Sequence, residues 1–185
     1  MGSADSSGIR AKATMSPESN AYLCSISDAG EQMDIHPKDK KVVGERLALL
    51  ARGHVYGETL LCDAPVAERI RRDGSRIEIT FQNAEGGLKV KGGAIEALHV
   101  YPVQMSGAEK SVCKGDGVQA AADTEGGADL REEIPVTADV EEMKLVILLP
   151  EGIGEVAVKF ARTRWYQVNL YNQADIPAIP FEFVC

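Results

Sequence analysis

Asp34 and His36 are the residues whose types and spacing most directly suggest chemistry. In an extended Asp-x-His segment both side chains point to the same side, so the carboxylate can reach Nδ1 of the imidazole. Such a pairing fixes the ring tautomer and stabilises the imidazolium that a general base forms. The simpler alternative is that Asp34 caps a helix or lies in a solvated loop. The pair is therefore a candidate general base with its orienting carboxylate.

The segment after His36 predicts a helix from Lys38 to about Tyr56, opened by Pro37, whose φ angle is already helical. Gly57 suits the left-handed residue that ends such a helix. An apolar stripe at helical spacing defines the face expected to be buried: Val42, Val43, Leu47, Leu49, Leu50 and His54. We expect the opposite face to be exposed to solvent, with Glu45, Arg46 and Arg52 on it. His54 is interpreted as a packed core histidine and not as a ligand.

The short apolar run Ala21 to Ser27 predicts a buried strand of a parallel sheet. The turn residues Asp28-Ala29-Gly30 end it, and a loop leads on to Asp34 and His36. A strand, a loop and a helix in this order would place these polar residues at the edge of the sheet where α/β proteins bind ligands. Asp28 is therefore a second candidate to orient His36.

Beyond residue 62 the pattern changes to short alternating strands separated by glycine turns, as in Arg76–Phe81, Leu88–Val90 and Glu155–Phe160. This pattern is typical of an antiparallel sandwich or similar β module. Lys114 to Asp129 is expected to be mainly a loop. The predicted organisation is a flexible leader (1–8), an α/β remnant made of a last strand and helix (9–61) and a β-sandwich-like domain (62–185). The fold class is α+β overall.

Composition excludes several classes of protein. A formal net charge of −8 and a pI near 5.0 argue against a nucleic-acid partner. No apolar run approaches the ~20 residues of a membrane span, and the first residues lack the features of a signal peptide. The cysteines have no zinc or redox spacing, and Cys24 is expected to be a buried thiol. His36, His54 and His99 also lack zinc-like spacing, so we predict no metal and no cofactor.

The segment Asp34-Ile35-His36-Pro37-Lys38-Asp39-Lys40, with Val43 to Leu49 and Val55-Tyr56-Gly57 after it, resembles the C-terminal catalytic block of the sialate O-acetylesterases. These are SGNH-type serine esterases that remove acetyl groups from sugars. The strand and "GL" turn at Ile79–Phe81 and Gly86–Leu88 are similar to the family, as is the ending Asn169–Asn172 with Ile176-Pro177-Ala178. The resemblance covers most of residues 9–183.

The resemblance implies a Ser-His-Asp hydrolysis in which His36 is the base and Asp34 orients it. The family's serine nucleophile and oxyanion-hole residues lie in earlier blocks, and no such block precedes Asp34 here. The chain thus resembles the last third of the enzyme, and we expect it to be inactive unless a missing N-terminal catalytic segment, or a second copy in a homodimer, supplies the rest. The implied ligand is an acetylated sugar such as a sialic acid, and the implied setting is secreted, periplasmic or lysosomal.

A non-catalytic carbohydrate-binding or assembly module is the alternative. Sugar-binding surfaces usually present aromatic rings for stacking. The chain has one tryptophan, Trp165, and 5% aromatic residues, and Trp165 is interpreted as a packing or rim residue. Loss of glycan binding in a Trp165→Ala protein, with binding unaffected by loss of His36, would favour this alternative.

Overall fold

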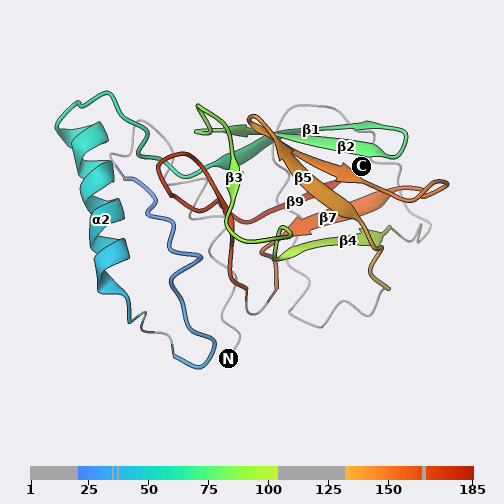
Figure 1. The fold of residues 1–185 in the computed structure, drawn as a ribbon, viewed down its shortest axis with the longest axis horizontal. Coiled ribbons are helices and arrows are strands. Elements are labelled where there is room, and N and C mark those ends of the chain that lie inside the picture. The colour runs from blue at the N-terminus through green and yellow to red at the C-terminus, as the bar shows by residue number, and fades with distance from the viewer. Residues whose placement is uncertain (1–20, 35, 37, 104–131, 164–165) are drawn as a thin grey trace.

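The computed structural model describes residues 21–34, 36, 38–103, 132–163 and 166–185, and shows a helical segment beside a set of β-sheets (Figure 1). The predictions for the leader (1–8), Pro37, the loop 114–129 and Trp165 lie outside the described residues. Within the described ranges, no helix is long and apolar enough to cross a membrane.

The predicted helix is present and begins two residues later than expected. The α-helix α2 runs over Lys40–Leu50 and continues into a π-helical turn, η1, over Ala51–Val55. Its N-cap is Asp39, whose carboxylate accepts hydrogen bonds from the backbone N–H groups of Lys41 and Val42. A side-chain cap of this kind satisfies N–H groups that have no partner within the helix, and so it sets where the helix starts.

The buried face of α2 differs from the predicted apolar stripe. Arg46 and Leu50 are its buried residues, whereas Leu47 is exposed. The expectation that Arg46 lies on the wet face is wrong, because its guanidinium meets the carboxylate of Asp28 on the preceding segment. A charged side chain is buried at low cost only when such a partner and further acceptors are present.

The segment Ala21–Ser27 is not a strand, and this prediction is wrong. It has no regular secondary structure, and it is tied to the β domain by a backbone hydrogen bond from Val168 N–H to the carbonyl of Ser27. Tyr22 and Ile26 remain exposed, and Cys24, which we expected to be buried, is only partly so. A strand needs a neighbour that pairs its backbone groups in a regular ladder, and within the described residues no strand pairs with this segment.

The second part of the chain forms antiparallel sheets, as predicted, and the α+β class is confirmed. Four strands lie in the order β1 (Val66–Asp73), β2 (Arg76–Gln82), β6 (Lys144–Leu148) and β5 (Thr137–Glu141). Three lie in the order β4 (Leu98–Pro102), β7 (Val156–Phe160) and β9 (Phe181–Val184). The short strands β3 (Lys89–Val90) and β8 (Leu170–Tyr171) pair with each other.

One hydrophobic core joins these sheets. In β2 alternate residues point inward, so that Ile77, Ile79 and Phe81 are buried. They belong to one cluster with Val158 and Phe160 of β7, across the core from β2. Each such side chain contributes about 1.5–3 kcal/mol by its burial. The β-sheets therefore share one core, and that cluster contains no residue of α2.

Asn172 fastens the chain that leads into β1. It is fully buried, and its amide donates hydrogen bonds to the carbonyls of Asp63 and Asn83 at 2.9 and 3.0 Å. Its side-chain oxygen accepts hydrogen bonds from the backbone N–H groups of Ala174 and Ile176. With all these hydrogen bonds, the buried amide holds together the loops that contain Asp63, Asn83 and Ala174.

Candidate functional site

The structure brings the predicted pair together on the loop that precedes α2. Nδ1 of His36 lies 3.2 Å from Oδ1 of Asp34, and the same oxygen accepts a hydrogen bond from the backbone N–H of His36 at 2.9 Å. An ion pair between Lys38 and Glu31, at 2.7 Å, closes the loop around them. One carboxylate oxygen thus orients both the backbone and the ring of His36, and Nε2 is the nitrogen that is left for a proton transfer.

The pair is open to solvent. The side chains of His36 and Asp34 are 78% and 46% exposed. An exposed ion pair is worth about 0–1 kcal/mol, because water screens it. Within the described ranges, no serine hydroxyl bonds to His36. The geometry shows an exposed imidazole oriented by a carboxylate.

Asp28, the other candidate orienter, belongs to a different cluster. Its carboxylate forms two hydrogen bonds with the guanidinium of Arg46, at 2.6 and 2.7 Å, and a third with the hydroxyl of Tyr171 at 3.0 Å. Arg46 also donates to the carbonyls of Ser25 and Asp175. The structure therefore pairs His36 with Asp34, and uses Asp28 to attach α2 and the segment before it to the β domain.

Electrostatics in this cluster follow from its burial and its charges. Burial by itself would raise the pKa of Asp28, but the hydrogen bonds and charge of Arg46, together with the Tyr171 hydroxyl, outweigh it and lower that pKa. Burial and the neighbouring Asp28 carboxylate raise the pKa of Tyr171 well above its usual range. Asp28 is thus held charged and Tyr171 neutral, which is the state in which all the hydrogen bonds of the cluster can form.

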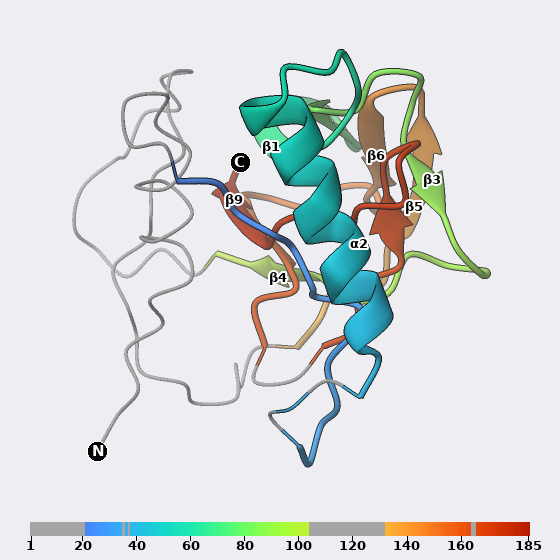
Figure 2. The same ribbon diagram turned by 90° about the vertical axis from the view of Figure 1, so that its left-hand side faces the viewer.

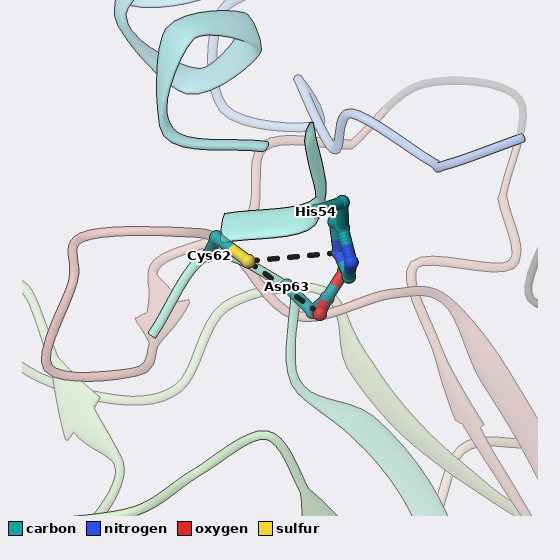
Figure 3. A group of neighbouring side chains, drawn as sticks. All are labelled: His54, Cys62 and Asp63. Atoms are coloured by element: carbon teal, nitrogen blue, oxygen red, sulfur yellow. Dashed lines mark hydrogen bonds and ion pairs between the residues drawn. The ribbon is translucent and has the colours of Figure 1, made fainter. Parts of the chain in front are cut away.

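A second cluster, His54–Cys62–Asp63, was not predicted (Figure 3). Nε2 of His54 lies 2.9 Å from Oδ1 of Asp63 and 3.6 Å from Sγ of Cys62, and Sγ lies 3.7 Å from Oδ2 of Asp63. The ring of His54 also stacks on Tyr22, with centroids 3.7 Å apart. The interpretation of His54 as a packed core histidine is wrong, because the residue is exposed and its ring contacts a carboxylate and a thiol.

The His54–Cys62–Asp63 cluster does not have the geometry of a cysteine nucleophile with its base. In a Cys-His-Asp relay the thiol and the carboxylate contact opposite nitrogens of the ring, whereas here both contact Nε2. Burial and the charge of Asp63 also raise the pKa of the Cys62 thiol. Its reactive thiolate form is therefore disfavoured.

The third histidine, His99, is also paired with a carboxylate. His99 lies in β4, and its Nδ1 is 3.1 Å from Oε1 of Glu133. It thus provides a carboxylate-paired histidine that the resemblance to the esterases does not involve.

A solved structure with a similar fold is the crystal structure of XAC1771, a novel carbohydrate acetylesterase from Xanthomonas citri. It superposes with a TM-score of 0.59 at 28% sequence identity, over 84% of this chain and 31% of that one. This chain therefore spans about a third of the length of that protein. No family model matches the sequence, and no curated protein matches it. The likeness supports a relation to carbohydrate esterases.

Proposed function

We propose that the chain is the C-terminal part of a sialate O-acetylesterase-like serine esterase of SGNH type, which removes acetyl groups from sugars. The observation that carries the proposal is the contact between Nδ1 of His36 and Asp34, in a chain that resembles part of a carbohydrate acetylesterase. In this proposal His36 is the general base and Asp34 orients it. The serine nucleophile and the oxyanion donors come from a segment outside residues 1–185.

The proposed reaction follows from the free nitrogen of the ring. Nε2 of His36 accepts the proton of the serine hydroxyl as its oxygen attacks the acetyl carbonyl. Collapse of the tetrahedral intermediate expels the sugar alkoxide, which takes that proton from the imidazolium. This leaves the acetyl group on the serine. A water molecule, deprotonated by His36, then attacks the acetyl carbonyl, and the imidazolium returns the proton to the serine oxygen as acetate leaves. Asp34 stabilises the imidazolium in both steps.

The missing segment would cover the helical side of the molecule. Figure 2 shows α2 on the outside of the molecule, beside the segment that leads to Asp34. At the end of this helical segment, Val55 and Tyr56 are 70% and 75% exposed, and Leu47 of α2 is exposed as well. An uncovered apolar surface of this kind favours association. A segment that also reached the loop before α2, where Met33 is 95% exposed, would exclude water from the His36–Asp34 pair and so strengthen the interaction between the two groups. The whole protein would act on acetylated glycans in a secreted, periplasmic or lysosomal setting.

The first test measures hydrolysis of p-nitrophenyl acetate by the purified chain and by its His36→Ala variant. We expect no difference between them. Co-expression with the N-terminal two thirds of a related carbohydrate acetylesterase should then produce turnover of an acetylated sugar. In that complex His36→Ala should lower kcat by about 10⁴-fold or more, and Asp34→Asn by about 10²–10⁴-fold.

His99→Ala is the matched control, because it removes another histidine that is paired with a carboxylate, and it should leave turnover unchanged. Full activity of the complex that carries His36→Ala would overturn the assignment of the base. Turnover by the chain alone that disappears in His36→Ala would show that the nucleophile lies within residues 1–185 or across a homodimer.

A further inference from the structure

We propose that His54, Cys62 and Asp63 form a binding site for a divalent transition metal, with Zn²⁺ as the ion that suits it best. Imidazole nitrogen, thiolate sulfur and carboxylate oxygen are the donors that zinc takes from proteins. The three candidate ligand atoms lie within 4.8 Å of one another. Figure 3 shows the three side chains converging on a common point. The inference is independent of the esterase reaction.

The contacts of the sulfur are close to the ligand separations of a tetrahedral ion. With metal–ligand distances of about 2.0 Å for nitrogen or oxygen and 2.3 Å for sulfur, neighbouring ligands of a tetrahedron lie about 3.5 Å apart when one is sulfur, and about 3.3 Å apart otherwise. The two contacts of Sγ, to Nε2 and to Oδ2, are 3.6 and 3.7 Å. Nε2 contacts the other carboxylate oxygen, Oδ1, at 2.9 Å. An ion that takes one oxygen from Asp63 therefore needs that hydrogen bond to open and the carboxylate to turn, within a group of donors that lie no more than 4.8 Å apart.

The backbone around the cluster leaves room for the thiol. A Cβ atom at position 53 would overlap Sγ of Cys62, so any larger residue there would force the Cys62 side chain to shift. Glycine inside a helix costs about 1 kcal/mol relative to alanine, and Gly53 has an ordinary helical conformation, because its φ angle is not positive. The close approach of Cys62 therefore favours glycine at this position. The π-helical turn Ala51–Val55, which carries Gly53 and His54, is a type of distortion that occurs frequently at functional sites.

Two further contacts hold the ligands in place. The carbonyl of Asp63 accepts a hydrogen bond from the buried amide of Asn172, which attaches this ligand to the β domain. The ring of His54 stacks on Tyr22 at an interplanar angle of 12°, which fixes the plane of the imidazole. Ligands positioned by surrounding contacts of this kind lose little freedom when they bind an ion.

The expected ion would connect two parts of the fold. His54 belongs to the helical segment, whereas Cys62 and Asp63 belong to the chain that enters β1. Three protein ligands leave a fourth position for water or another donor. The side chains of His54 and Asp63 are partly exposed, at 25% and 32%, so that position can be reached from solvent. Binding would replace the thiol proton of Cys62, which is released to the buffer, and would fasten the helical segment to the β domain.

The test uses the full chain, freed of metal by a chelator, and titrates it with Zn²⁺ and with Co²⁺. We expect one equivalent to bind, a rise in melting temperature with Zn²⁺, and a cysteinate-to-cobalt charge-transfer band together with the strong visible bands of tetrahedral Co²⁺. His54→Ala, Cys62→Ser and Asp63→Asn should each weaken binding by about 100-fold, as expected when one of a small set of ligands is lost. Cys24→Ser and His99→Ala are controls that should bind as the parent does.

Melting curves of the metal-free variants check that each is folded. If Cys62→Ser fails to fold, an alkylation assay on the unmutated chain takes the place of that variant. Zn²⁺ should slow the alkylation of Cys62 by iodoacetamide, as measured by peptide mass, and should leave the alkylation of Cys24 unchanged. Absence of one-equivalent binding would overturn the proposal. So would a cobalt spectrum without sulfur charge transfer, or unchanged binding in Cys62→Ser.

Discussion

Replacing Asp28 by asparagine tests the role assigned to the buried Arg46–Asp28 pair. The side chains of Arg46 and Asp28 are only 6% and 15% exposed, and the closest contact of the pair is 2.6 Å. Asp28→Asn keeps the shape of the side chain but leaves the guanidinium buried without a counter-charge. Breaking a buried pair on one side costs about 3–5 kcal/mol. We expect the lower end, because asparagine still accepts one hydrogen bond from Arg46.

The expected loss of stability can be measured as a decrease in melting temperature. For a chain of this size, 1 kcal/mol shifts the melting temperature by about 2–4 °C, so a loss of about 3 kcal/mol predicts a decrease of about 6–12 °C at pH 7. Glu58→Gln is the matched control: its pair with Arg52 has the same 2.6 Å contact, but its side chains are 51% and 43% exposed. That control should lose less than about 1 kcal/mol.

The contribution of the Arg46–Asp28 pair to stability should depend on pH. The folded-state pKa of Asp28 lies below its ordinary value of 3.8. Its contribution to stability is therefore complete above about pH 4, and it is lost as the pH falls through the folded-state pKa. The difference in melting temperature between the parent and Asp28→Asn should shrink below pH 4. Arg46→Met, added to Asp28→Asn, should recover part of the loss by removing the unpaired charge. A loss in Asp28→Asn no larger than in Glu58→Gln would refute this reasoning.

Two further changes address the contacts that organise the loops. Asn172→Ala should lower the free energy of unfolding by about 3 kcal/mol, because it leaves buried backbone groups of three loops without partners. Urea denaturation measures this loss, and a loss below about 1 kcal/mol would contradict the prediction. Tyr171→Phe should cost about 1 kcal/mol at pH 7. Because the pKa of Tyr171 is raised in the folded protein, the parent loses stability as the pH rises above about 10, where the unfolded chain ionises. The phenylalanine variant should lack that part of the loss, and equal alkaline slopes for the two proteins would contradict the assignment.

Local patterns predicted the features that depend on neighbouring residues in the chain. The spacing of Asp34 and His36 alone lets the carboxylate reach the ring, and the structure has that contact. Alternation of apolar residues predicted the antiparallel strands, because side chains alternate between the two faces of a strand wherever it pairs. The helical period predicted α2, although the cap at Asp39 moved its start to Lys40.

The features that the sequence could not predict depend on groups that are distant along the chain. From the sequence alone Arg46 is expected on the surface. It is buried because its guanidinium bonds to the carboxylate of Asp28 and the carbonyl of Asp175, which are 18 and 129 residues away along the chain. Ala21–Ser27 has the composition of a buried strand, but a strand exists only where another chain segment pairs with it. His54 comes together with Cys62 and Asp63 only because the chain turns back after the π-helical segment, and their spacing matches no zinc motif. Sequence alone thus determined α2, the antiparallel strands and the contact between His36 and Asp34. Which charged side chains are buried, and which donors converge on one point, was decided by tertiary packing, since only packing sets the partners that make such burial and convergence favourable.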